Sequence, residues 1–110
     1  MVNVLINCHL WHINVVPEND LRLIKNGTQL DGCSRLYERE IIIKNSLQKS
    51  MFRQVLIHEL SHAYLAETDI SQETRVSYSE EELCTFNEYN AEMIVNTANS
   101  VTEIIYKRRK

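Results

Sequence analysis

Residues 1–44 carry short apolar runs separated by polar residues, and this pattern predicts β-strands. We expect strands over Val2–Ile6 and Trp11–Val16, the second being rich in β-branched side chains, which favour an extended backbone. Proline has no N–H to donate within a sheet, so Pro17–Asp20 predicts a turn or the start of a short helix.

Two glycine-containing dipeptides precede the next strand. Asn26-Gly27 and Asp31-Gly32 both favour tight turns, and they enclose a short segment that we interpret as a hairpin or loop. Leu36–Lys44 follows and includes three consecutive isoleucines, the most β-prone triplet in the chain. We therefore expect a third strand over Leu36–Lys44.

The second half of the chain changes to helical spacing. Apolar residues recur at intervals of three and four from residue 47 to about residue 67, which predicts a helix there. The polar stretch Thr68–Ser77 predicts a loop, and Ser79 begins a second long helical pattern. The apolar positions of that last helix are Leu83, Phe86, Met93, Ile94, Val101, Ile104 and Ile105. Strands followed by two long helices predict one α+β domain over residues 1–110, with a short N-terminal sheet.

Charge and composition narrow the function classes. The 110 residues are 44% hydrophobic with a net charge of −3, so nucleic-acid binding is not expected. Four consecutive cations, Lys107–Lys110, favour a solvated helix end, with an interaction tail as the alternative.

Cysteine usage and the absence of long apolar segments indicate the compartment. Cys8, Cys33 and Cys84 are odd in number and show no metal-binding spacing, so we interpret them as reduced, partly buried thiols. Neither a signal peptide nor a membrane-spanning segment is recognisable. We expect a cytoplasmic protein.

His58-Glu59-Leu60-Ser61-His62 is the motif that carries the most chemistry. Residues four apart share one face of a helix, so His58 and His62 can direct both imidazoles at one metal ion. Glu59 lies close enough to act on a water molecule at that metal without being a ligand. This is the zincin pattern of two zinc ligands and a general base.

A catalytic zinc ion needs a third protein ligand, which we expect from the start of the last helix. Glu82 is our choice because it begins the apolar stripe of that helix, whereas Glu80 and Glu81 remain alternatives. Ser79 and Glu82 also form a capping-box pattern, a purely structural use of the same carboxylate.

Two segments together resemble a known family. Val55–Tyr64, followed after a loop by Glu82–Phe86, is similar to the ImmA/IrrE-type metallopeptidases of the gluzincin group, whose compact forms occur in phages and mobile elements. The resemblance covers roughly residues 28–95. It implies a small zincin-like domain, one bound Zn²⁺ and Glu82 as third ligand, and a protein substrate such as a transcriptional regulator.

Other residues enter this hypothesis with weaker roles. Tyr78 and Tyr89 are candidate donors to the oxyanion, although packing is the more common use of a tyrosine near a core. Residues 39–44 are a candidate edge strand for an extended substrate, with an ordinary internal strand as the alternative. His9 and His12 would point to opposite faces of a strand, so we interpret both as structural.

Three function classes follow from these patterns. The leading one is a zinc metalloendopeptidase that hydrolyses a protein partner. The alternative is a catalytically silent zincin-fold protein that sequesters a host or phage protein, against which the intact Glu59 argues. A zinc-dependent RNA hydrolase is disfavoured because no histidine follows His62 and because the chain is acidic.

Overall fold

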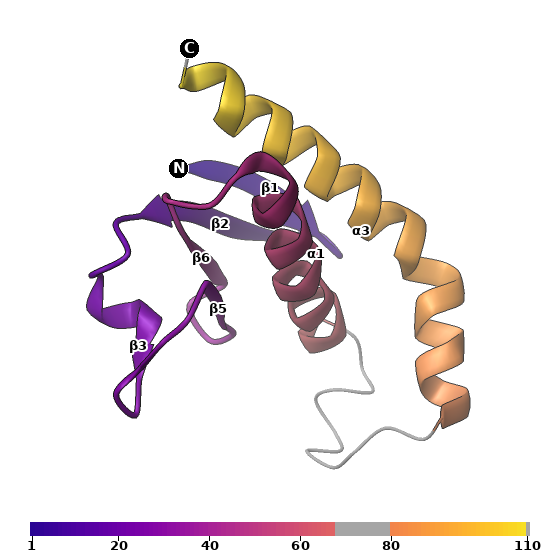
Figure 1. Cartoon of the computed structure of the whole chain (residues 1–110). Coiled ribbons are helices and arrows are strands. Elements are labelled where there is room, and N and C mark those ends of the chain that lie inside the picture. Colours follow the sequence, from indigo (N-terminus) through magenta and orange to yellow (C-terminus); the bar gives the residue numbers. More distant parts are fainter. Residues whose placement is uncertain (68–79, 110) are drawn as a thin grey trace.

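The computed structural model describes the backbone of residues 1–67 and 80–109, and side chains over 1–67 and 90–109. The elements in order are β1 (Val2–Ile6), β2 (His9–Val16), the 3₁₀ turn η1 (Leu21–Leu23), β3 (Ile24–Lys25), β4 (Thr28–Gln29), β5 (Gly32–Arg35), β6 (Glu40–Lys44), α1 (Lys49–Ala66) and α3 (Glu80–Arg108). Both helices lie on one face of the sheet (Figure 1). This arrangement confirms the expected small α+β fold, while the predicted loop Thr68–Ser77 lies outside the described residues.

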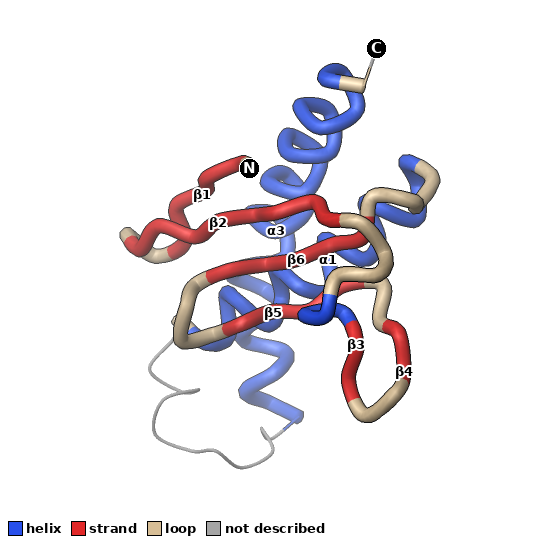
Figure 2. The backbone as a smooth tube through the Cα atoms, turned by 90° about the vertical axis from the view of Figure 1, so that its left-hand side faces the viewer, coloured by secondary structure: helices blue, strands red, loops and turns tan. Residues whose placement is uncertain are grey.

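The main sheet is mixed and has the order β1-β2-β6-β5 (Figure 2). β2 and β6 are parallel, whereas β1 pairs with β2 and β5 with β6 in antiparallel fashion. β6 is therefore an internal strand, and β1 and β5 form the two edges. The parallel pair is possible because η1 and the β3–β4 hairpin lead from the end of β2 to the start of β5 at the same end of the sheet, and β5 then runs back to the start of β6.

Two turn predictions have different outcomes. Asn26 and Gly27 have positive φ values of 53° and 77° and join β3 to β4, so the predicted hairpin is confirmed. Gly32, in contrast, is the first residue of β5 and does not belong to a turn. The expected strand over Leu36–Lys44 is also too long, because residues 36–39 form the β5–β6 turn, in which Arg39 has a φ of 51°.

The isoleucine triplet of β6 is fully buried because both faces of the central strand are covered. Ile41 and Ile43 pack in the main core against the helices. Ile42 points to the other face, where Leu23 of η1 and Val16 cover it in a second, smaller cluster. A strand buried on both faces is uniformly apolar rather than alternating, which is what the sequence of β6 shows.

Of the apolar positions that recur at helical spacing in α1, Val55 is half-buried and the others are buried: Phe52, Leu56, Leu60, Ala63 and Tyr64. In α3, Ile94, Val101 and Ile105 are buried, whereas Met93 and Ile104 are 55% and 39% exposed. Our assignment of Met93 and Ile104 to the core face was therefore wrong, because a single partner helix and a small sheet cover only part of so long a helix.

The last turn of α3 folds against the entry to α1. Tyr106 donates its hydroxyl proton to the main-chain oxygen of Leu47 at 2.6 Å, and the Arg109 guanidinium lies 4.4 Å from the centre of the Tyr106 ring. The end of the basic tail that is described therefore contacts the domain and is not wholly solvated.

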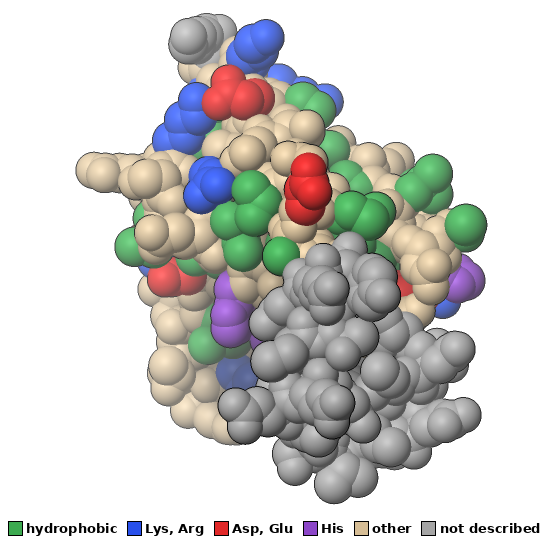
Figure 3. Space-filling model, turned by 90° about the vertical axis from the view of Figure 1, so that its right-hand side faces the viewer, with side chains coloured by type: hydrophobic (Ala, Val, Ile, Leu, Met, Phe, Trp, Pro, Cys, Tyr) green, Lys and Arg blue, Asp and Glu red, His purple; other side chains and the backbone are tan. Residues whose placement is uncertain are grey.

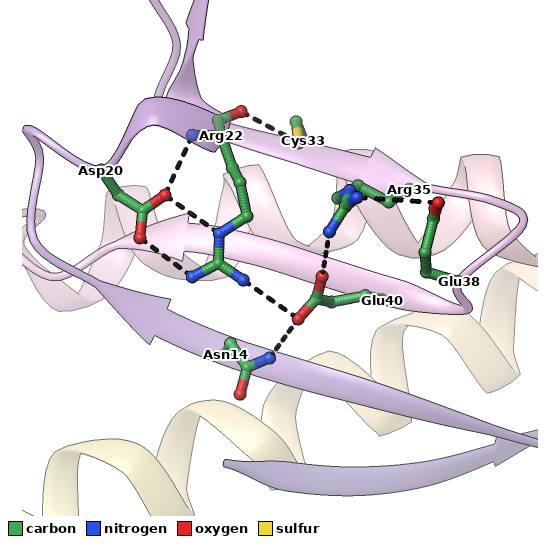
Figure 4. Close-up of polar contacts among 7 residues, drawn as sticks. All are labelled: Asn14, Asp20, Arg22, Cys33, Arg35, Glu38 and Glu40. Atoms are coloured by element: carbon green, nitrogen blue, oxygen red, sulfur yellow. Dashed lines mark hydrogen bonds and ion pairs between the residues drawn. The ribbon is translucent and has the colours of Figure 1, made fainter.

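The sheet face opposite the helices carries a polar network (Figure 4). Arg22 of η1 bonds to Asp20 and Glu40, and Glu40 also binds Arg35 of the neighbouring strand β5. This network fastens the crossover segment to the sheet.

Within the described residues, no helix is long and apolar enough to cross a membrane.

Candidate metal centre

The third and fourth turns of α1 bring the two predicted zinc ligands together. The Nε2 atoms of His58 and His62 lie 3.2 Å apart, and the two rings are inclined by 80°. Both side chains are exposed, and Figure 3 shows histidine side chains at the surface on the α3 side of the molecule.

This separation can be compared with the demands of zinc. Two nitrogens at 2.0–2.1 Å from a tetrahedral zinc ion are about 3.3 Å apart, so the two Nε2 atoms have nearly the required spacing. The same spacing also suits a hydrogen bond between two neutral imidazoles. The imidazole pair therefore fits half of a tetrahedral zinc site without rearrangement of α1.

Glu59 points away from solvent and towards the sheet. It is only 7% exposed, and its Oε1 accepts a hydrogen bond of 2.8 Å from the hydroxyl of Ser34 on β5. Ser34 is the only described residue for which a hydrogen bond to this carboxylate is found. Glu59 is thus a buried carboxylate next in sequence to the exposed His58, with one oxygen bonded to the sheet.

The third ligand falls on a part of the chain whose side chains are not described. Glu82, like the alternatives Glu80 and Glu81, lies in the first turn of α3, and its side chain is outside the described residues, as is that of Tyr89. Tyr78 also lies outside them. Among the side chains that are described, no group of three or more His, Cys, Asp and Glu residues is arranged to hold a metal ion.

The edge strand next to the motif is β5, and this corrects the sequence expectation. Residues 39–44 were the candidate edge, but β6 is paired on both sides, so the ordinary internal strand is correct. β5 occupies the edge and packs directly on α1. A Cβ atom added to Gly32 would lie 2.8 Å from Val55 Cγ1 and 3.5 Å from Glu59 Cγ, so a larger residue here would force α1 and β5 to shift.

Another buried carboxylate fixes the end of α1. The Oε1 of Glu67 accepts hydrogen bonds from Trp11 Nε1 at 3.1 Å and Arg39 Nε at 2.8 Å, and its Oε2 lies 3.5 Å from His9. His9 therefore ties the sheet to the helix, as its structural interpretation required. His12 Nδ1 bonds to Asn3 Oδ1 at 2.6 Å within the β1–β2 hairpin.

Cys33, the neighbour of Ser34 on β5, faces the opposite side of the sheet. Burial raises the pKa of its thiol, and the nearby Glu59 carboxylate raises it further. This makes Cys33 a poor nucleophile. Cys8 is exposed in the β1–β2 turn, so its expected partial burial was wrong.

Comparison of the chain with protein-family models, curated proteins and solved structures finds no match. The functional interpretation therefore depends on the residues themselves. Sequence reasoning missed the roles of Gly32, Ser34 and Glu67, because their contacts between the sheet and α1 join residues 23 or more positions apart along the chain.

Proposed function

We propose that this protein is a zinc-dependent metalloendopeptidase related to the ImmA/IrrE type, with His58, His62 and Glu82 as the zinc ligands. The observation that carries the proposal is the 3.2 Å separation of the two imidazole Nε2 atoms on the exposed face of α1, with the buried Glu59 between them in sequence. Bound zinc would acidify a water molecule and polarise the scissile carbonyl group.

The chain's own contribution is the handling of protons. Glu59 would accept a proton from the attacking water and pass it to the amine that leaves when the peptide bond breaks. Its burial limits competing contacts with solvent, and one of its oxygens is held by Ser34. The second oxygen is then the one that exchanges the proton.

The substrate would lie along β5 as an additional strand. Lys44 N donates to Asp31 O, and antiparallel pairing alternates, so the main-chain groups of Gly32 and Ser34 face the free edge. An extended peptide that pairs with them would pass over the helix that carries the motif. We infer a protein or peptide substrate, such as a transcriptional regulator, and no nucleic-acid partner.

We further propose that the protein works in the cytoplasm. The two described cysteines, Cys8 and Cys33, are free thiols, which a reducing compartment preserves.

The deciding experiment is metal analysis of the purified protein. We expect one zinc per chain in the wild type and its loss in His62→Ala and Glu82→Ala. His12→Ala is the matched control, since the hydrogen bond found for the His12 side chain among the described residues stays within the β1–β2 hairpin, and this variant should retain zinc. Full zinc in both site variants would contradict the ligand assignment, and a wild type without zinc would indicate that the imidazoles merely bond to each other.

A further inference from the structure

Ser34 joins the edge strand to the buried carboxylate of the motif. Its hydroxyl lies 2.8 Å from Glu59 Oε1 and 3.1 Å from the main-chain oxygen of the same residue. The serine is on β5 and the glutamate on α1, 25 positions apart in sequence. The contact is therefore a product of the tertiary fold.

The hydroxyl has one proton for these two acceptors. The main-chain carbonyl of Glu59 belongs to a regular part of α1, where main-chain N–H groups already donate hydrogen bonds to the carbonyl oxygens. The carboxylate is the stronger acceptor because it is charged, and the shorter distance is to its Oε1. Ser34 thus directs its proton to the side chain and fixes which carboxylate oxygen remains available.

The local packing maintains this contact. Gly32 and Ser34 are two apart on a strand, so they face the same side, towards α1. The missing side chain at Gly32 allows Val55 and the Glu59 side chain to approach β5. A serine placed two residues further along then meets the carboxylate at hydrogen-bond distance.

We propose that Ser34 is a positioning residue that holds Glu59 for proton transfer and links its orientation to the strand on which the substrate docks. This inference rests on the proposed function and extends it. Ser34 contacts the general base through its side chain, while its main chain faces the free edge. A peptide that pairs with β5 therefore docks beside the residue that orients the base.

The test uses calorimetry to measure how tightly zinc-loaded protein binds the probe acetohydroxamic acid. When this acid binds zinc as its anion, the proton of its N–OH group must pass to a nearby acceptor, here the Glu59 carboxylate. Azide binds zinc without releasing a proton and is the reference probe. We expect Ser34→Ala to lower the affinity for acetohydroxamate about tenfold, which is the scale of one hydrogen bond to a charged group, and to leave the affinity for azide unchanged.

An isosteric pair separates the hydroxyl from packing. Ser34→Thr keeps the hydroxyl and Ser34→Val removes it, so the first should bind acetohydroxamate like the wild type and the second like Ser34→Ala. This pair also decides the question if Ser34→Ala does not fold. Ser46→Ala is the matched control because it removes a serine–glutamate hydrogen bond, to Glu18, far from α1's motif.

The results distinguish this inference from the proposed function. Wild-type affinity for acetohydroxamate in Ser34→Val, together with weakened binding in Glu59→Gln, overturns the role of Ser34 and leaves the metallopeptidase proposal intact. If Ser34→Val and Ser34→Thr lose affinity for acetohydroxamate and for azide to the same extent, Ser34 acts only in packing, and the inference is overturned. If the wild type binds no zinc, or if Glu59→Gln binds acetohydroxamate normally, both proposals are wrong.

Discussion

At the scale of single residues, the buried polar groups carry the most information. Within the described part of the chain, Glu59, Glu67 and Thr102 are the buried polar or charged residues. Each of the two carboxylates has partners, whereas Thr102 Oγ1 has none. A buried group with partners is a candidate for function or for fixing an element, and one without partners is a cost to stability.

The role of Glu59 can be tested by removing its charge alone. Glu59→Gln keeps the size of the side chain and an oxygen that can accept the Ser34 hydrogen bond, so fold and zinc content should remain. Turnover should fall by at least about 100-fold, the scale of general-base catalysis, and the loss should appear in kcat rather than KM. Loss of zinc in this variant, or cleavage at the wild-type rate, contradicts the assignment.

Thr102→Val should stabilise the domain. Valine has the same shape and a similar helix propensity, and it removes the unpartnered buried hydroxyl, so we expect the free energy of unfolding in urea to rise by about 1 kcal/mol. Thr97→Val is the matched control on the same helix. Thr97 lies 3.5 Å from the Tyr64 hydroxyl, so its replacement should give no gain. An equal rise in both variants would assign the effect to valine itself.

At the scale of elements, α1 is attached to the sheet at two places in addition to the packing of its apolar stripe. Gly32 and Ser34 of β5 contact its middle, and Glu67 binds Trp11 and Arg39 at its end. The second attachment lies one turn beyond His62. The orientation of the candidate ligands therefore depends on a carboxylate that is not part of the motif.

Glu67→Gln should weaken the end of α1. The substitution removes the charge that binds Arg39 and leaves Trp11 Nε1 with a weaker acceptor, so we expect a loss of about 2 kcal/mol in unfolding free energy. Hydrogen exchange should speed up most in the last turn of α1. Glu38→Gln is a suitable control because its contact with Arg35 is exposed, and it should change stability by less than about 0.5 kcal/mol. A uniform increase in exchange across all elements would contradict a local role.

The contribution of the Asp20–Arg22 pair at η1 to stability should depend on pH. Hydrogen bonds from Arg22, first from its side chain and then from its backbone N–H, lower the pKa of Asp20 from 3.8 to about 2 (Figure 4). A lowered folded-state pKa means that Asp20 contributes stability above about pH 4, and that this contribution is lost as the pH falls towards 2. We expect Asp20→Asn to be less stable than wild type at pH 7, with the difference shrinking below about pH 4 in urea titrations. In an Arg22→Ala background this pH-dependent difference should largely disappear, and its persistence there would contradict the assigned cause.

At the scale of the whole molecule, the position of the motif favours selective recognition. The larger of the two described cavities, about 540 Å³, lies between the start of α1 and Asn99–Glu103, and the second lies between β1 and α3. Neither is lined by His58 or His62. We expect a substrate at the motif to depend on extended pairing with β5 and on surfaces further away, because a chain of 110 residues has little room for one deep pocket.

We therefore expect wild-type protein to cleave unfolded casein slowly or not at all, while cleaving one protein partner efficiently. Incubation of zinc-loaded protein with casein, with Glu59→Gln as the inactive control, measures the general activity. Rapid casein degradation that disappears in Glu59→Gln would show that recognition is not selective. Stable binding of a partner that neither wild type nor Glu59→Gln cleaves would favour the sequestering alternative.

The sequence by itself determined the class of fold and the pair of candidate ligands, since both follow from local periodicity. Spacing of four on α1 places His58 and His62 together, and apolar spacing defined the buried face of that helix. Tertiary structure alone decided that β5 and not β6 is the edge, because strand order depends on pairings between distant segments. It also decided the contacts of Ser34 and Glu67, since a hydroxyl or carboxylate acquires its partner only when distant elements pack together. Long-range packing, which no local pattern encodes, therefore set the surroundings of the motif.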